Sequence, residues 1–268
     1  MRTVLERDDR DPTQAAPPDN VEIRLHDVEL RFGQKIVLSG CSLDCERGKV
    51  TCVIGMSGAG KSTILRVING LRRPYRGLVY IDGKEISGLP ERELIEVRKK
   101  MGFAFQYSAL FDSMTIADNV AFPLHEHTSL TRTEIGKRVS EVLASLGLED
   151  VGDRLPSELS GGMQKRVGFA RAIVNDPKIL LFDEPTSGLD PIIANVITDT
   201  IRDIHSNLGA TCVVVSHDLN YVYSMADTIA MLFEGTIIES GPADKIRNSP
   251  NPLVQQFLQG SVLGPIPI

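Results

Sequence analysis

The stretch that decides the fold is a glycine-rich loop, Gly55-Met56-Ser57-Gly58-Ala59-Gly60-Lys61-Ser62. It follows the apolar run Val50–Ile54 and precedes a helical pattern, in which apolar residues recur from Ile64 to Leu71 at helical spacing. A strand, a glycine loop and a helix in this order form half of a β-α-β unit. Glycines let successive backbone N–H groups turn inward around phosphate oxygens, and the helix adds the positive end of its dipole. The sequence therefore predicts a phosphate-binding loop in an α/β protein.

The composition is that of a folded globular protein with a mild negative charge. The chain has 268 residues, 42% of them hydrophobic and 24% charged, and a formal net charge of −6. This acidity argues against a nucleic-acid partner, because proteins that bind nucleic acid carry a basic surface. No apolar run approaches the roughly 18 residues of a bilayer-crossing helix, and the first residues contain no apolar signal-peptide core. We therefore expect a cytoplasmic protein whose role at a membrane depends on a partner.

The glycine-rich loop matches the pattern G-x-x-x-x-G-K-[ST] in full. Lys61 is expected to reach the β- and γ-phosphates of a nucleotide, and the Ser62 hydroxyl is expected to ligate Mg²⁺. The alternative is a glycine turn without a ligand, and the flanking strand and helix count against it. The predicted nucleotide-binding residues of this segment are Gly55, Met56, Ser57, Gly58, Ala59, Gly60, Lys61, Ser62 and Thr63.

Two adjacent carboxylates follow a second buried strand. The run Ile179-Leu-Leu-Phe precedes Asp183 and Glu184. Ligands of parallel sheets bind at the carboxyl ends of the strands, which is where these side chains are expected. We expect Asp183 to hold Mg²⁺ and Glu184 to polarise the attacking water. A pair that caps a helix is the alternative interpretation of two such carboxylates.

A second anion site is predicted at Leu159-Ser160-Gly161-Gly162-Met163-Gln164, before another helical stretch. Ser160 stands where it would cap that helix, with free N–H groups behind it. Because the first loop already binds the phosphates within this chain, a second such site is useful for the nucleotide of another subunit. With this pair of sites the chain resembles the nucleotide-binding subunits of ATP-binding cassette (ABC) transporters. The resemblance implies a homodimer in which Ser160, Gly161 and Gly162 contact the nucleotide of the partner copy.

Four residues match the remaining motifs of that family in the expected order. Phe32 lies where the family places an aromatic ring that stacks on adenine. Gln106 resembles the Q-loop glutamine, which senses Mg²⁺ and the attacking water and whose loop couples the site to the membrane partner. Asp190 resembles the aspartate of the D-loop, which crosses the dimer interface. His217 resembles the switch histidine that contacts the γ-phosphate.

The resemblance implies an ATPase that converts ATP and water to ADP and phosphate, with ATP and Mg²⁺ bound. The catalytic residues that it implies are Lys61, Glu184 and His217. The Mg²⁺ ligands that it implies are Ser62, Gln106 and Asp183.

The expected fold class is α/β, with a P-loop NTPase core of the ABC ATPase type, a helical subdomain and a short C-terminal tail. We expect a flexible N-terminal tail over residues 1–20 and the ABC ATPase domain over residues 21–245. The helical subdomain is expected at about 108–165, and the tail at 246–268 is a possible subunit contact. Thr131 and Glu134 have the spacing of a capping box and predict the start of an amphipathic helix in the subdomain.

Two segments are similar to one branch of the family, the ATPases of the Mla/Mce lipid-transport systems. The first runs from Tyr107 to Thr128 and contains Ala-Leu-Phe, Asn-Val and Phe-Pro-Leu. The second is the Gln-Phe-Leu-Gln-Gly segment with its following Gly264-Pro265. As a hypothesis, Phe257 and Leu258 of this tail pack against the partner ATPase or a small regulator.

This branch implies an ATPase that powers phospholipid transport between inner and outer membranes and so maintains outer-membrane lipid asymmetry. The implied partners are a second ATPase copy, a multispan permease, an Mce-domain lipid-handling subunit and a small STAS-domain subunit. The chain would lie on the cytoplasmic face of the inner membrane through the permease. The alternatives are the ATPase of an amino-acid or osmolyte importer, and a P-loop ATPase without a transport role.

Histidines and cysteines offer little evidence for a further metal site. His125 and His127 have no third ligand nearby, so we expect a solvent-exposed loop rather than a metal pair. The four cysteines lack the C-x-x-C spacing of zinc sites. Cys52 and Cys212 lie in apolar strand-like runs, where buried and reduced thiols are expected.

Overall fold

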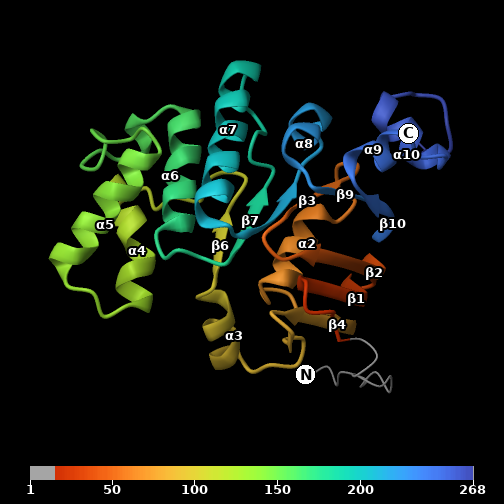
Figure 1. The fold of residues 1–268 in the computed structure, drawn as a ribbon, viewed down its shortest axis with the longest axis horizontal. Coiled ribbons are helices and arrows are strands. Elements are labelled where there is room, and N and C mark those ends of the chain that lie inside the picture. The colour runs from red at the N-terminus through yellow and green to blue at the C-terminus, as the bar shows by residue number, and fades with distance from the viewer. Residues whose placement is uncertain (1–15, 268) are drawn as a thin grey trace. The chain divides into compact units, whose positions relative to one another are not determined.

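The computed structural model describes residues 16–267, so most of the predicted N-terminal tail lies outside the described residues. The described chain divides into two compact units. The first joins residues 16–97 to residues 213–267, and the second comprises residues 98–212. Both units combine strands with helices (Figure 1).

The first unit contains a four-stranded antiparallel sheet in the order β2-β1-β4-β5. Its strands are β1 (Val21–Phe32), β2 (Lys35–Glu46), β4 (Arg76–Ile81) and β5 (Lys84–Glu85). The apolar residues Ile23, Leu25, Val28 and Leu30 of β1 are buried, whereas Phe32 at the end of the strand is partly exposed. The sheet thus brings the predicted adenine-stacking ring to the end of a long strand.

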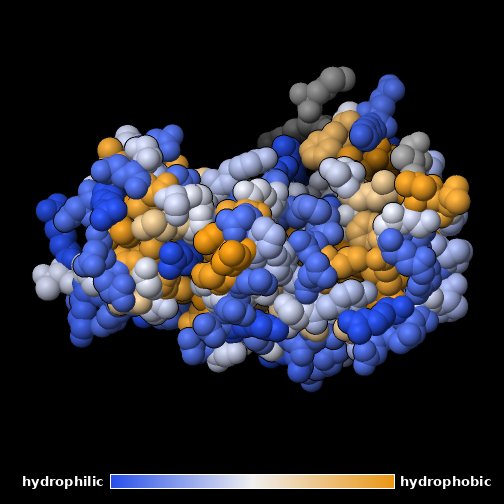
Figure 2. Space-filling view, turned by 90° about the horizontal axis from the view of Figure 1, so that it is seen from above, coloured by the Kyte–Doolittle hydropathy of each residue, from blue (hydrophilic) through white to orange (hydrophobic). Residues whose placement is uncertain are grey.

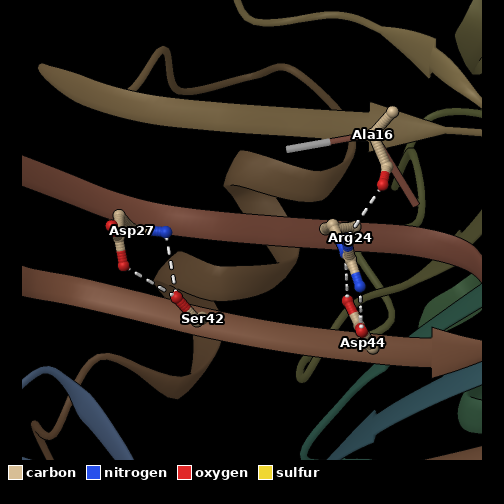
Figure 3. A network of polar contacts seen from close by, with 5 residues as sticks. All are labelled: Ala16, Arg24, Asp27, Ser42 and Asp44. Carbon is tan, nitrogen blue, oxygen red and sulfur yellow. Dashed lines mark hydrogen bonds and ion pairs between the residues drawn. The ribbon is translucent and has the colours of Figure 1, made fainter. Parts of the chain in front are cut away.

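A β-bulge explains why the buried positions of β1 change from odd to even numbers. The register shifts between Leu25 and Val28, and Asp27 has a φ of 49°. A bulge inserts one extra residue, so the side chains that follow it change face. Ser42 on β2 supports the bulge, because its hydroxyl accepts a 2.9 Å hydrogen bond from the Asp27 N–H and donates to Asp27 Oδ1 at 3.1 Å (Figure 3). Three residues before the bulge, Arg24 forms two hydrogen bonds with the Asp44 carboxylate.

The first unit also holds strands in the order β10-β9-β3-β8, with β3 parallel to β9. These are β3 (Val50–Ile54), β8 (Thr211–Val215, whose last three residues belong to this unit), β9 (Thr228–Phe233) and β10 (Thr236–Gly241). Its helices are α2 (Lys61–Ile68), α3 (Glu91–Arg98, at the boundary of the unit), α8 (Leu219–Met225), α9 (Ala243–Arg247) and α10 (Pro252–Gln259). The predicted strand, glycine loop and helix are confirmed as β3, the loop and α2.

The second unit pairs two parallel strands and carries the larger helices. The strands are β6 (Met101–Ala104) and β7 (Ile179–Asp183). The helices are α4 (Ile116–His127), α5 (Arg132–Ser145), the short 3-10 helix η1 (Pro156–Glu158), α6 (Gly161–Ile173) and α7 (Pro191–Leu208). The predicted capping box of Thr131 and Glu134 is confirmed at the start of α5. The predicted range 108–165 holds α4, α5, η1 and the first turn of α6.

The loop predicted at His125 and His127 is wrong, because both residues belong to the last turn of α4. Their side chains are exposed, as expected. The helix continues through Pro123, because Ile116, Val120 and Leu124 form a buried stripe at a spacing of four residues. This burial stabilises the helix enough to tolerate a proline in its last turns.

The burial of the cysteines agrees with the expectation from the sequence. All four cysteines are buried and free. Burial raises the pKa of the Cys41 and Cys45 thiols to about 12, so both remain protonated and unreactive. Among residues 16–267, no helix has the length and apolar character that a membrane crossing requires.

Candidate nucleotide-binding site

The glycine-rich loop joins β3 to α2 and wraps around the amine of Lys61. Lys61 is buried, and its Nζ donates hydrogen bonds to the carbonyl oxygens of Gly55 at 3.0 Å and Met56 at 3.1 Å. The ammonium is therefore held inside the curve of the loop. No side chain caps α2 at Gly60, so the positive end of the helix dipole faces the loop. This arrangement is typical of a backbone cradle for phosphate.

Glycine is required at the start of the loop for a steric reason. Gly55 has a φ of 152°, and a Cβ added there would lie 2.3 Å from the carbonyl oxygen of Leu232 on β9. No L-residue side chain fits at that distance. The loop thus leaves β3 in close contact with the neighbouring strand, which fixes the position from which its N–H groups curve inward.

Phe32 and His217 belong to the same unit as this loop. Phe32 is partly exposed, and the guanidinium carbon of Arg72 lies 5.2 Å from the centre of its ring. His217 is exposed and follows β8. The Ser216 N–H donates to the Val53 carbonyl at 3.1 Å, so the segment before His217 lies beside β3, the strand that leads into the loop. The first unit therefore carries Phe32, residues 55–63 and His217 of the predicted site.

The second unit carries the two predicted carboxylates at the end of β7. Asp183 and Glu184 are both buried. Glu184 has a φ of 47°, in the left-handed region that non-glycine residues rarely adopt, and it precedes Pro185. Residues before proline favour extended conformations, so this backbone is strained. Strain of this kind concentrates at functional sites, where the surrounding structure maintains it.

Gln106 lies two residues beyond the end of β6, in the Q-loop, which we define as residues 105–109. Its Nε2 donates a 3.4 Å hydrogen bond to the hydroxyl of Ser187. Its carbonyl oxygen accepts a hydrogen bond from Nζ of Lys165 on α6, and the same Nζ lies 3.5 Å from the Glu184 carbonyl oxygen. Burial lowers the pKa of Lys165, although the charges of Asp183 and Glu184 act in the opposite direction. The second unit thus brings Gln106 and Glu184 together through a lysine.

Ser160 and Asp190 cap two helices of the second unit. The Ser160 hydroxyl accepts from the Met163 N–H at 3.3 Å at the start of α6, as predicted. Asp190 Oδ1 accepts from the N–H groups of Ile192 and Ile193 at 3.0 Å each at the start of α7. Both residues are exposed, and Gly161 and Gly162 form the first turn of α6.

Sequence reasoning gave no role to Lys165. The residue occupies the same side of α6 as Phe169 and Ala172, which are buried. A lysine on the apolar face of a predicted helix is a usable signal, because lysine is rarely buried unless its amine has partners. Nothing in the sequence, however, names the two carbonyl groups that it contacts.

The predicted donors of each unit, taken separately, suit ATP and Mg²⁺ by their chemistry. Glycine N–H groups and a lysine suit phosphate oxygens, and the Ser62 hydroxyl, the Gln106 amide oxygen and the Asp183 carboxylate are the oxygen ligands that Mg²⁺ prefers. The glycines, Lys61 and Ser62 belong to the first unit. Gln106 and Asp183 belong to the second.

Comparisons with known proteins agree on one family. The family model described as "ABC transporter" matches residues 38–187. Over 245 residues the chain is 42% identical to the intermembrane phospholipid transport system ATP-binding protein MlaF of Escherichia coli (strain K12), covering 91% of both chains. It is 41% identical over 249 residues to the probable ribonucleotide transport ATP-binding protein mkl of Mycobacterium tuberculosis (strain H37Rv), covering 93% of this chain and 69% of that protein. The solved dimer of an ATP-binding cassette in a post-hydrolysis state with ADP and Pi is 34% identical, with a TM-score of 0.75, over 82% of this chain and 98% of that chain.

Proposed function

Because this chain belongs to the ABC transporter family, we propose that it is the ATP-hydrolysing subunit of a complex that transports phospholipid between the inner and outer membranes. The observation that carries this proposal is the 42% identity to MlaF along 91% of both chains. The Mla/Mce-like segment that begins at Tyr107 and the C-terminal Gln-Phe-Leu-Gln-Gly segment support the same branch.

The residues of the predicted site suit in-line transfer of the γ-phosphoryl group to water. The N–H groups of the glycine-rich loop and the Lys61 ammonium bind the β- and γ-phosphates, while Phe32 stacks on adenine. The Glu184 carboxylate orients the attacking water and accepts its proton, and His217 donates to the γ-phosphate. When bound, Mg²⁺ held by Ser62, Gln106 and Asp183 neutralises phosphate charge.

A second copy of the chain completes each site in this proposal. Ser160, Gly161 and Gly162 contact the nucleotide bound by the partner copy, and Asp190 lies at the interface. The first turns of α7 follow Asp190 and expose apolar side chains, with Ile192 76% exposed. Figure 2 looks down on this end of α7 and shows hydrophobic side chains gathered over it. Such a patch suits a surface that a partner covers.

Substitution of Glu184 by glutamine tests the catalytic part of the proposal. Glutamine keeps the shape of the side chain but cannot accept the proton of water, so the variant should bind ATP and accumulate as an ATP-bound dimer with almost no turnover. Glu141→Gln is the matched control, because Glu141 is an exposed residue of α5 whose Oε1 lies 3.8 Å from Nζ of Lys137. Gel filtration in the presence of ATP measures the amount of dimer, and an assay of phosphate release measures turnover. Undiminished turnover in Glu184→Gln would remove this residue from the role of base.

The second unit offers a groove for the permease beside the Q-loop. It has a volume of about 330 Å³ and is lined by apolar and basic side chains of β6, the Q-loop, α4 and α6. Two pairs of aromatic rings form much of its wall. The ring centroids of Phe103 and Phe105 lie 4.2 Å apart, and those of Phe111 and Phe122 lie 5.0 Å apart. A short amphipathic helix of the permease suits such a groove. Through this contact the chain would lie on the cytoplasmic face of the inner membrane.

The C-terminal tail suits a further subunit contact, with a different pair of residues from those expected. Phe257 and Leu258 are half-buried, whereas Val262 and Leu263 are 76% and 83% exposed. Gln256 fixes this loop, because its side chain bonds to Ser261 and to both backbone groups of Ile266. The double substitution Val262→Ser and Leu263→Ser should reduce complex assembly. It should leave the ATPase rate of the isolated chain unchanged. Unchanged assembly would exclude this loop as the contact.

The cargo is tested by what co-purifies with the chain. The mycobacterial relative, which is 41% identical, is named as a probable ribonucleotide transport ATP-binding protein, so the cargo needs an experiment of its own. We would isolate the tagged chain from mildly solubilised native membranes and identify proteins and lipids by mass spectrometry. An Mce-domain protein, a permease, a STAS-domain subunit and bound phospholipid would support the lipid branch. Co-purification of a permease that depends on a substrate-binding protein would be compatible with the ATPase assignment but would contradict phospholipid as the cargo.

A further inference from the structure

Helix α6 contains a buried lysine with an unusual set of partners. Lys165 is only 6% exposed. Its Nζ donates to the Gln106 carbonyl oxygen and lies 3.5 Å from the Glu184 carbonyl oxygen. A buried ammonium must be matched by acceptors, because its desolvation is costly. Here these acceptors belong to the backbone of the Q-loop and of the predicted catalytic carboxylate, 78 residues apart in the chain.

The Glu184 carbonyl belongs to a residue whose backbone needs support. With a φ of 47° before Pro185, Glu184 occupies a conformation that costs free energy. Its carbonyl oxygen also accepts a 3.2 Å hydrogen bond from the Ser187 N–H. A positive charge beside this carbonyl stabilises the peptide group in the strained orientation, because hydrogen bonds and dipoles facing a charge are the stronger ones. The direction of the Glu184 side chain depends on that peptide orientation.

The Q-loop is held by a second cation of the same helix. Arg171 donates to the carbonyl oxygens of Ser108 at 2.7 Å and Ala109 at 2.8 Å. These two residues also have positive φ values, 59° and 48°. Arg171 therefore holds the C-terminal end of the Q-loop. Of the two cations, Lys165 is the one that contacts both the Q-loop and Glu184.

We propose that Lys165 is a positioning residue of the ATPase reaction. Its ammonium connects the Q-loop to the backbone of Glu184 and so holds the Glu184 carboxylate where it can orient the attacking water. The inference rests on the proposed function. It also supplies a physical link from the groove beside the Q-loop to the reaction, because a displacement of Gln106 pulls on the ammonium that supports Glu184. Misplacement of a catalytic group by about 1 Å can cost about a hundredfold in rate.

Substitution of Lys165 by methionine removes the ammonium while keeping a straight side chain of similar length. We expect kcat for ATP to fall about tenfold to a hundredfold, with KM for ATP within about twofold of wild type, because the phosphates are bound elsewhere. Lys165→Arg retains N–H donors for two carbonyl oxygens. Its log kcat should recover at least half of the difference between wild type and Lys165→Met. Thermal unfolding of each variant shows that the chain is folded.

Arg166→Met is the matched control, because Arg166 is the next residue of α6 and also donates to backbone carbonyls, those of Leu146 at 2.9 Å and Gly147 at 3.4 Å. It touches neither Gln106 nor Glu184, so its kcat should stay within twofold of wild type. Equal kcat losses in Lys165→Met and Arg166→Met would show a general effect of helix packing and overturn the inference, as would a wild-type kcat in Lys165→Met. Loss of turnover in Glu184→Gln together with normal Lys165→Met would reject this inference alone. Normal turnover in Glu184→Gln would reject the catalytic assignment on which it rests.

Discussion

Asn119 is expected to hold the segment between the Q-loop and α4, and its removal should be one of the more damaging single changes in the second unit. The side chain is fully buried. Its Oδ1 accepts a 2.7 Å hydrogen bond from the Phe111 N–H. Its Nδ2 donates to the carbonyl oxygens of Phe111, Met114 and Thr115 at 3.1, 3.2 and 2.9 Å. One amide thus fixes both ends of a five-residue loop that ends at the cap of α4.

The expected cost follows from these bonds. An amide NH₂ has two hydrogens for its three acceptors, so Asn119 forms the equivalent of three full hydrogen bonds. At about 1 kcal/mol net for each, Asn119→Ala should lower the free energy of unfolding by about 3 kcal/mol. That is a large part of the roughly 5–15 kcal/mol that stabilises a typical protein. Asn119→Asp should cost more, because its carboxylate would face three carbonyl oxygens.

Thermal unfolding followed by circular dichroism measures this cost. Asn119→Ala should lower the melting temperature by about 6–12 °C. Asn175→Ala is the matched control, since the Asn175 amide donates a long 3.4 Å hydrogen bond to the Pro123 carbonyl and should shift the melting temperature by no more than about 3 °C. Because Phe111 lines the groove beside the Q-loop, Asn119→Ala should also weaken co-purification of the permease. A melting temperature for Asn119→Ala equal to that of the control would refute this reasoning.

Three further changes test the local structure. Gly55→Ala should destabilise the chain by about 1–3 kcal/mol and abolish ATP binding measured by fluorescent nucleotide, because the added Cβ would lie 2.3 Å from the Leu232 carbonyl oxygen; full binding would contradict this geometry. Gly136→Ala should raise the free energy of unfolding by about 0.5–1 kcal/mol in urea titrations, because this exposed position of α5 has open space around it; a loss of stability would be the contrary result. Glu134→Gln tests the capping box by pH, because the hydrogen bonds from the Thr131 hydroxyl and N–H lower the pKa of Glu134. The wild type should melt above the variant at neutral pH, and the gap should close as the pH falls below about 4.5 through the lowered pKa; a gap independent of pH would contradict it.

Features that depend on local chemistry could be predicted from the sequence. The glycine-rich loop lies between β3 and α2 because the apolar runs on either side form the strand and the helix, while its glycines permit the positive φ values of the turn. Ser160 and Thr131 cap their helices because a hydroxyl at such a position satisfies an N–H that the helix cannot. The roles of Gln106, Asp190 and His217 came instead from resemblance to a family, and they remain predictions.

Features that depend on long-range contacts could not be predicted from the sequence. The partners of Lys165 come from two segments that lie 59 and 19 residues away along the chain. The left-handed backbone of Glu184 has no sequence signal, because glutamate before proline ordinarily predicts extended structure. The helix at His125 and His127 was missed for a related reason, since the burial of Leu124 against the rest of the unit outweighs the local effect of Pro123.

Gly162 shows why one residue pattern can have two causes. In the sequence, Gly161 and Gly162 indicate an anion site, because glycines expose backbone N–H groups at a helix start. In the structure, a Cβ on Gly162 would also lie 2.6 Å from Cγ2 of Ile193, whereas a Cβ on Gly161 would make an ordinary 3.8 Å contact with Leu189. Glycine at 162 therefore permits close packing of α6 against α7, independently of any nucleotide. Loss of activity on substituting Gly162 would not by itself demonstrate phosphate binding, and Gly161 is the position at which the two causes separate.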